Sequence, residues 1–441
     1  MPFYSLLLLL CTFACTLSAT AQRLRLQDVA AAQARIWENY RQELRAAGDT
    51  LPQLLPLTTL ENSLAQEHRW TLPSWLEASA SMRFHYGSKG QRPQEGYPLF
   101  LYLHGSGEPL REWHTGWQLA KHFADAPSAY FVPMIPQAGA WYRWYQQSKQ
   151  WAWERLLRKA LADVQIDPTR LYLLGISEGG YGSQRLASFY ADYLAGAGPM
   201  AGGEPLRNAP PDNCAHVGFS FLTGAKDYAF HRDFLTEETR KAFDRLATAY
   251  PGYYPHRIQL IPGMGHGIDY RPTTPWLAKH RRVAQPKWWR WESFPMNGRY
   301  REAFYNLRID RWTRPSAPSA ARLDSLGQYD EQAPRRMHTF KVVGQTIELS
   351  IEEVEYLVTS RSPQWHFPLT FERQFRLARG GSYTLFLSDN LLDLSRPIRL
   401  VVNGQTRFQG RVARSEESIL ESLSTFHDPL RLFPATLRFH L

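Results

Sequence analysis

The sequence predicts an α/β protein with a doubly wound, mostly parallel sheet, followed by a β-rich module. Two observations carry this prediction. From 82 to 284, short apolar runs of strand-like composition alternate with amphipathic segments of helical spacing, which is the pattern of βα units. After 284 the helical spacing gives way to closely spaced strand-like runs. With 441 residues the chain exceeds one typical domain, so further parts beside the α/β domain are expected.

Residues 22–81 form the segment that precedes the predicted α/β domain. They are rich in Ala, Gln, Leu and Glu and have helical spacing from 29 to 46, with prolines at 52, 56 and 73. We expect a helical N-terminal cap that packs on the α/β domain.

The region 285–441 contains strand-like runs and two short connecting signals. The predicted strands are 288–293, 303–309, 346–355, 382–387, 398–402, 406–412 and 434–440, with a helix at 416–423. Asn403-Gly404 is a strong type I′ hairpin signal. Residues 314–336, rich in Pro, Ser, Ala and Arg, indicate an exposed linker. We therefore predict a β-sandwich for this region.

The first 21 residues resemble a signal peptide. An apolar run from 4 to 17 is too short to span a bilayer, and Ala19-Thr20-Ala21 fits an A-x-A cleavage site. We expect a secreted or periplasmic protein with no stable membrane span. A lipid anchor at Cys15 is the alternative, although the residues before it fit a lipobox poorly. Without the leader only Cys214 remains, which excludes an internal disulfide.

The most informative motif is Gly175-Ile176-Ser177-Glu178-Gly179. An apolar strand-like run leads directly into it and an amphipathic helical segment follows, so the motif fits a nucleophile elbow. Ser177 is the candidate nucleophile. The alternative is a glycine-rich turn whose serine only caps the helix.

A serine hydroxyl is a weak nucleophile at neutral pH, so the motif requires a base and an acid, in the order Ser, Asp or Glu, His. Asp227 follows an apolar strand and a glycine turn, and Asp233 is its rival in a predicted helix. His266 lies on a glycine-rich loop after the next strand and is the candidate base. The alternative histidines are His104, His256 and His280.

The oxyanion site is predicted at the end of another buried strand, 97–103, which runs into His104-Gly105-Ser106-Gly107. We expect the main-chain N–H groups of Ser106 and Glu178 to be the donors. His104 and Gly105 are then expected beside the substrate. The Glu178 side chain has two interpretations, a pair with a nearby arginine or a contact with a substrate group. An aromatic insert containing Trp141 and Trp144 is expected to shape the acyl or sugar pocket.

These motifs, in this order, resemble the α/β-hydrolase superfamily. Within it the chain is similar to secreted esterases related to polyhydroxybutyrate depolymerases, feruloyl and acetylxylan esterases, and dienelactone hydrolases. The resemblance covers about 82–284 and implies a Ser177-Asp227-His266 triad with no metal or organic cofactor. The tract from 387 to 404 resembles a C-terminal module of such esterases, for which carbohydrate binding and a structural flank of the cleft are both open.

The composition of the chain indicates which classes of binding partner to expect. The chain has 51 Lys plus Arg against 41 Asp plus Glu, a net charge of +10 that favours anionic partners such as acidic polysaccharide. Nucleic acid is not expected, because the basic residues are scattered and no binding module is visible. Fifteen tryptophans fit sugar stacking or, alternatively, core packing.

The sequence thus predicts a secreted serine esterase acting on an ester substrate, with acyl or feruloyl groups on polysaccharide as candidates. A serine peptidase of the same fold and a non-catalytic carbohydrate-binding protein are the alternatives. The oligomeric state is left open by the sequence.

Overall fold

The computed structural model describes residues 23–46, 54, 57–66, 68–77, 80–136, 143–312 and 333–441. The predicted signal peptide and Trp141 lie outside the described residues, as does most of the predicted linker 314–336. No helix in these ranges has both the length and the apolar character needed to cross a membrane.

The first large element is a nine-stranded sheet in the order β1-β3-β5-β4-β6-β7-β8-β9, with β2 beside β3. From β5 through β4 and on to β9 all neighbours are parallel, whereas β3 runs antiparallel to β5. This confirms the predicted mostly parallel sheet. The strands are β1 (Thr58–Thr59), β2 (His68–Thr71), β3 (Ser81–Lys89), β4 (Tyr97–Leu103), β5 (Ser128–Pro133), β6 (Ile166–Ile176), β7 (Gly196–Met200), β8 (Gly218–Gly224) and β9 (His256–Ile261).

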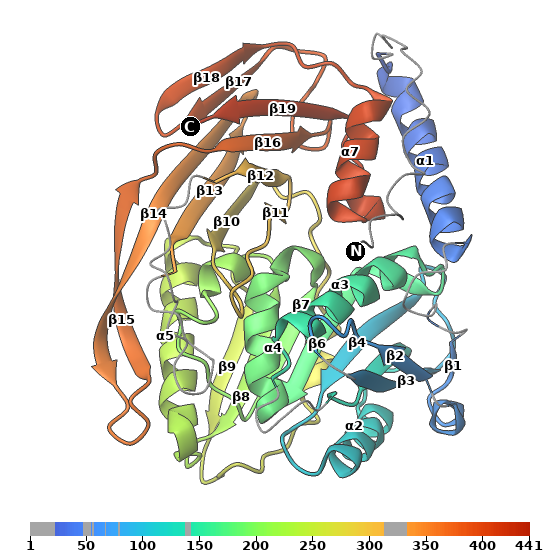
Figure 1. The fold of residues 1–441 in the computed structure, drawn as a ribbon, viewed down its shortest axis with the longest axis vertical. Coiled ribbons are helices and arrows are strands. Elements are labelled where there is room, and N and C mark those ends of the chain that lie inside the picture. Colours follow the sequence, from blue (N-terminus) through green and yellow to red (C-terminus); the bar gives the residue numbers. More distant parts are fainter. Residues whose placement is uncertain are drawn as a thin grey trace, which may run out of the picture.

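Helices cover both faces of this sheet (Figure 1). Alternate residues of β4 enter different cores: Leu99 and Leu103 join one apolar cluster, and Phe100 and Tyr102 join the other. Side chains of successive strand residues point to opposite faces, so a strand buried on both sides reads as a continuous apolar run. One face packs on α3 (Gln147–Ala162), α4 (Glu178–Phe189) and α5 (Arg232–Ala249), and the other on α2 (Pro109–His122) and α6 (Thr273–Leu277).

The N-terminal segment differs from the expected helical cap. It has one long helix, α1 (Leu26–Ala46), whose apolar face packs against α7 (Glu416–Phe426) of the C-terminal region. Ala32 and Ile36 contact Ile419 and Leu423 there. Residues from Thr58 onward form β1 and β2 at the edge of the large sheet, with the short 3₁₀ helix η1 (Asn62–Ala65) between them. A helical periodicity identifies an apolar face but not its partner. Helix α1 also reaches the α/β domain, where Arg41 Nε donates to the Ala162 carbonyl at 3.0 Å.

The C-terminal region is built from two sheets that share a core. Trp291 of the first stacks on Phe304 of the second at a ring distance of 5.3 Å, and Trp289 Nε1 donates to Asn306 Oδ1 at 3.0 Å. This agrees with the predicted sandwich. The first sheet holds β10 (Trp288–Ser293), β13 (Arg335–Val343), β14 (Thr346–Arg361), β15 (Pro368–Leu377), β17 (Ile398–Val402) and β18 (Gln405–Gly410); the second holds β11 (Ala303–Phe304), β12 (Leu307–Arg311), β16 (Ser382–Leu387) and β19 (Ala435–His440).

Details of this region test the sequence signals. Asn403 (φ 48°) and Gly404 (φ 77°) both have positive φ and join β17 to β18, as a type I′ turn requires. Strands β13 and β15 were not predicted, and the predicted linker extends two residues into β13.

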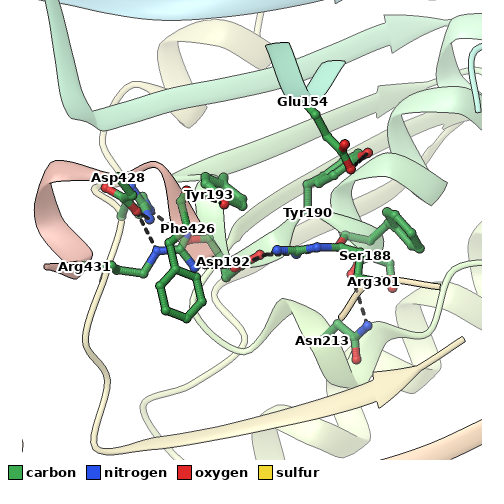
Figure 2. Close-up of polar contacts among 12 residues, drawn as sticks. Glu154, Ser188, Tyr190, Asp192, Tyr193, Asn213, Arg301, Phe426, Asp428 and Arg431 are labelled. Carbon is green, nitrogen blue, oxygen red and sulfur yellow. Dashed lines mark hydrogen bonds and ion pairs between the residues drawn. The ribbon is translucent and has the colours of Figure 1, made fainter. Parts of the chain in front are cut away.

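The sandwich is joined to the α/β domain by buried ion pairs (Figure 2). Asp192, in the 3₁₀ turn η2 (Ala191–Tyr193), accepts hydrogen bonds from Arg301 and Arg431, and Arg431 also donates to Asp428 at 2.6 Å. Arg282 contacts the Asp428 carboxylate as well. Asp192, Asp428 and Arg431 are completely buried. Since an unpaired charge is costly there, these pairs tie the two regions into one packed unit.

Candidate active site

Ser177 lies at the sharp turn between β6 and α4, with φ 56° and ψ −113°. Its N–H donates to the Met200 carbonyl of β7 at 3.0 Å. The glycines on either side are required by space: a Cβ on Gly175 would lie 2.2 Å from the Gly179 carbonyl oxygen, and one on Gly179 would lie 2.0 Å from that of Leu103. The motif therefore forms the tight strand-to-helix turn that its sequence predicts.

Three predicted site residues meet at the carboxyl end of the sheet. Asp227 follows β8 and His266 follows β9, and these strands are neighbours. His266 Nδ1 lies 2.7 Å from Asp227 Oδ2, and His266 Nε2 lies 3.0 Å from Ser177 Oγ. The hydroxyl, imidazole and carboxylate thus form one hydrogen-bonded chain. Asp227 is buried, whereas 46% of the His266 side chain is exposed, so the chain opens to solvent at its reactive end.

The rival residues have other surroundings. Asp233 lies in the first turn of α5, and its N–H donates to the Asp227 carbonyl at 3.2 Å. His256 pairs with Asp244 at 3.0 Å, and His280 contacts the Trp276 carbonyl at 3.2 Å. The structure therefore brings His266, and not these two histidines, to Ser177.

The glycine loop after β4 lies beside the serine. A Cβ on Gly105 would be only 3.4 Å from Ser177 Cβ, and Ser106 is exposed on the same loop. This places the predicted oxyanion loop next to the nucleophile, so donation by the Ser106 and Glu178 N–H groups remains a proposal that this position supports.

His104 and Trp144 position this loop. His104 Nε2 accepts from the Ile135 N–H at 3.0 Å, its Nδ1–H donates to the Gly105 carbonyl at 2.7 Å, and burial lowers its pKa to about 4. The Trp144 indole N–H donates to the His104 carbonyl at 3.0 Å. Both side chains are fully buried, so neither presents a surface to substrate, in contrast to the expectation that they line the pocket.

Glu178 is a buried carboxylic acid directly after the nucleophile. Its Oε2 lies 3.5 Å from Arg143 Nη1, and its Oε1 has no hydrogen-bond partner among the described residues. The structure thus agrees with the arginine-pair interpretation. Burial raises the pKa of Glu178 to about 8, because the attraction of Arg143, Arg185 and Arg232 does not offset the lost hydration.

Sequence reasoning missed Arg232. Its Nη1 donates to Asp227 Oδ1 at 2.9 Å, so the carboxylate is held from both sides, by Arg232 and His266. The two residues before Arg232, Phe230 (φ 54°) and His231 (φ 57°), both have left-handed backbone. An arginine five residues after a candidate acid is the only local signal that could have pointed to this contact.

No group of three or more His, Cys, Asp or Glu side chains suited to a metal ion occurs in the described ranges. Cys214 is buried, and burial raises the pKa of its thiol.

Comparison with known proteins gives the following matches. No family profile matches the chain. Poly(3-hydroxyalkanoate) depolymerase C of Paucimonas lemoignei is 27% identical over 118 residues, covering 24% of this chain and 28% of that protein. The putative esterase NocK of Nocardia uniformis subsp. tsuyamanensis is 29% identical over 143 residues, covering 31% of this chain and 41% of that protein. The chain therefore matches less than half the length of either relative.

Three of the solved structures that align with part of this chain are esterases or depolymerases. A thermostable esterase is 20% identical, with 49% of this chain and 63% of that chain covered and a TM-score of 0.38. A ferulic acid esterase is 14% identical, with 48% and 98% covered and a TM-score of 0.37. The poly(3-hydroxybutyrate) depolymerase LpqC of Bordetella parapertussis is 17% identical, with 51% and 93% covered and a TM-score of 0.36.

Proposed function

We propose that this chain, an α/β-hydrolase by its fold and its sequence matches, is a serine esterase with Ser177, His266 and Asp227 as its catalytic residues. The observation that carries the proposal is the hydrogen-bonded chain from Ser177 Oγ through His266 to Asp227, at 3.0 and 2.7 Å, with its imidazole half exposed. Such a series of hydrogen bonds converts the weakly nucleophilic serine hydroxyl into a reactive one.

The proposed mechanism follows from these contacts. His266 Nε2 takes the proton of Ser177 as Oγ attacks the ester carbonyl carbon, and Asp227 accepts the Nδ1–H bond and stabilises the imidazolium. The main-chain N–H groups of Ser106 and Glu178 receive the developing oxyanion. His266 then protonates the departing alkoxide, leaving an acyl-enzyme. Water attacks this ester with the same base and frees the acid.

We further propose that the substrates are acyl or feruloyl esters on polysaccharide, and that residues 1–21 export the protein. Support comes from the net charge of +10, which favours acidic polymers, and from the exposed site. The matched proteins are named for a polyester depolymerase and an esterase, which supports ester chemistry over peptide cleavage.

Ser177→Ala tests the nucleophile. Loss of the hydroxyl should lower kcat for p-nitrophenyl acetate by about 10⁵ to 10⁶ and abolish covalent labelling by a fluorophosphonate probe. Ser424→Ala is the matched control, because Ser424 is an exposed serine of α7 that bonds only the Glu421 carbonyl at 2.9 Å in the described structure. Unchanged turnover in Ser177→Ala would exclude the proposed mechanism, and a wild-type protein that neither labels nor hydrolyses esters would favour the non-catalytic alternative.

A further inference from the structure

The hairpin formed by β14 and β15 extends from the sandwich along the side of α5 (Figure 1). Buried contacts hold it in place, one to the α/β domain at Asp212 and one to β10 of the sandwich at Glu292. Arg373 of β15 donates to Asp212 at 2.6 Å, and the Tyr356 hydroxyl of β14 donates to Glu292 at 2.8 Å. Both carboxylates are completely buried. These contacts fix the hairpin midway along its length, so its tip has a defined position.

The tip of this hairpin, 362–367, touches the loop of the proposed catalytic acid. His231 Nε2 lies 2.8 Å from Ser362 Oγ, and Phe230 stacks on Trp365 with ring centroids 4.9 Å apart. The tip is also ordered internally, since the Ser362 N–H donates to the Phe367 carbonyl at 2.9 Å. A segment of the C-terminal module thus contacts the turn that carries Asp227.

The contacted residues are coupled to the carboxylate of Asp227. Phe230 and His231 have left-handed φ values, which cost energy for side chains of this size and persist only where the surroundings hold them. Arg232 follows them, donates to Asp227 and lies 5.2 Å over the Phe230 ring. Between the stacked pair and the His266–Asp227 hydrogen bond there is thus a single short turn of chain.

The stacked pair is exposed. Trp365 exposes 43% and Phe230 42% of their surfaces, and Tyr228 on the same turn exposes 67%. We call these three residues the aromatic rim. Exposed aromatic side chains that gather on one surface are a recognised mark of a binding site, and these lie on or against the loop that follows Asp227. The rim combines one residue of the C-terminal module with two of the α/β domain.

We propose that the aromatic rim is a substrate subsite that binds a sugar ring of the polysaccharide whose ester group Ser177 attacks, with Trp365 as the main stacking surface. This inference rests on the proposed function. A pyranose ring presents a flat C–H face that packs on an indole, while its hydroxyls remain in water. A half-exposed indole fixed by a stacked phenyl ring and a hydrogen-bonded tip meets that requirement, because little conformational entropy is lost on binding.

The subsite also gives the C-terminal module a role. The hairpin is a part of the sandwich that reaches the acid loop, so in this proposal the module adds to the substrate-binding surface rather than acting as an independent binding domain. Of the two roles left open by the sequence, the cleft-completing flank is favoured.

The test compares a polymeric with a small substrate. Trp365→Ala should lower the ratio of kcat/KM on acetylated xylan to kcat/KM on p-nitrophenyl acetate about tenfold, mainly through KM, since loss of one stacking contact is worth about 1.4 kcal/mol. Trp365→Phe should restore most of the ratio. Phe375→Ala is the matched control: Phe375 lies on β15 of the same hairpin and is 42% exposed, but it is distant in sequence from the tip.

A second readout needs no turnover. Ser177→Ala should retard in affinity electrophoresis through acetylated xylan, and Ser177→Ala with Trp365→Ala should lose that retardation. An unchanged substrate ratio, or an equal loss with Phe375→Ala, would overturn the subsite while leaving the esterase proposal intact. Trp365 dependence on amorphous poly(3-hydroxybutyrate) alone would overturn the sugar assignment. Absence of hydrolysis and of Ser177 labelling in the wild type would instead reject the proposed function itself.

Discussion

Two buried aspartates of this chain each contact two basic side chains, but only one of them has a partner that reaches solvent. Asp227 is 2% exposed and contacts Arg232 and His266, and Asp192 is 0% exposed and contacts Arg301 and Arg431. Around Asp192 both partners are guanidinium groups that cannot lose a proton at physiological pH. Around Asp227 one partner is an imidazole whose other nitrogen reaches Ser177 and solvent. The Asp192 carboxylate therefore has a structural role between two parts of the molecule, whereas the Asp227 carboxylate ends a series of hydrogen bonds suited to proton transfer.

The number and type of cations around a buried carboxylate decide whether it stays ionised and fixed or takes part in proton transfer. Burial alone would raise the pKa of Asp192, but Arg301 and Arg431 outweigh it and hold the value at about 2. A carboxylate so paired stays ionised and rigid. At Asp227 one of the two guanidinium groups is replaced by the His266 imidazole, which can gain and lose a proton.

The largest effect is expected from disrupting the contacts of Asp227 with His266 and Arg232. Asp227→Asn should lower kcat on p-nitrophenyl acetate about 10⁴-fold, because an amide no longer stabilises the imidazolium or fixes its tautomer. Asp233→Asn is the matched control, an acid in the first turn of α5 whose side chain is not part of the proposed triad. Circular dichroism checks that both variants fold. A larger loss in Asp233→Asn than in Asp227→Asn would reassign the acid.

Breaking the buried ion pairs of Asp192 should lower stability instead of activity. Arg431→Met leaves Asp192 and Asp428 each short of one cation in a buried site, and we expect a loss of about 3 to 5 kcal/mol in the free energy of unfolding, measured with urea. Arg438→Met is the control, since Arg438 is 61% exposed in its pair with Glu421 and should cost below about 1 kcal/mol. Equal losses in the two variants would contradict the distinction drawn between buried and exposed pairs.

The same cluster gives an acid-stability signature. The folded pKa of Asp192, about 2, lies below its ordinary value of 3.8. Its contribution to stability is therefore fully present above about pH 4 and is lost as the pH falls towards 2.

Local patterns in the sequence predicted the elements that depend on local chemistry. The boundaries predicted at 288–293, 382–387 and 398–402 agree with β10, β16 and β17, because alternating apolar residues and turn glycines define such strands. The predicted motif residues Ser177, Asp227 and His266 meet in space, since strand order brings the carboxyl ends of neighbouring strands together.

What the sequence missed depends on contacts between distant segments. Only the first two residues of β15 are buried, so it lacks the alternation that identifies a strand, and its place along α5 comes from Arg373 reaching Asp212, 161 residues away. Trp144 belongs to an aromatic run that fits a pocket wall, yet tertiary packing buries it against the His104 loop. Neither the partner of an apolar helix face nor the reach of a hairpin is encoded in a local window.

Glu178 sharpens the comparison as an intermediate case, and its expected effect is the smallest. Arg143 lies 3.5 Å from its carboxylate and Arg185 and Arg232 lie further away, and burial raises its pKa to about 8 from 4.5. The unfolded chain therefore loses this proton near pH 4.5 while the folded chain keeps it, so the free energy of unfolding falls as the pH rises from about 4.5 to 8 and then levels off.

Glu178→Gln, which mimics the neutral acid, should increase the free energy of unfolding at pH 9 by about 3 kcal/mol or less, with little change at pH 4. Thermal unfolding at both pH values measures the difference, and Glu238→Gln provides the control, since Glu238 is partly exposed and pairs with the half-exposed Lys241. A stabilisation equal at pH 4 and pH 9 would show that folding does not raise the pKa of this carboxyl group, and hence that the arginines around it offset its burial.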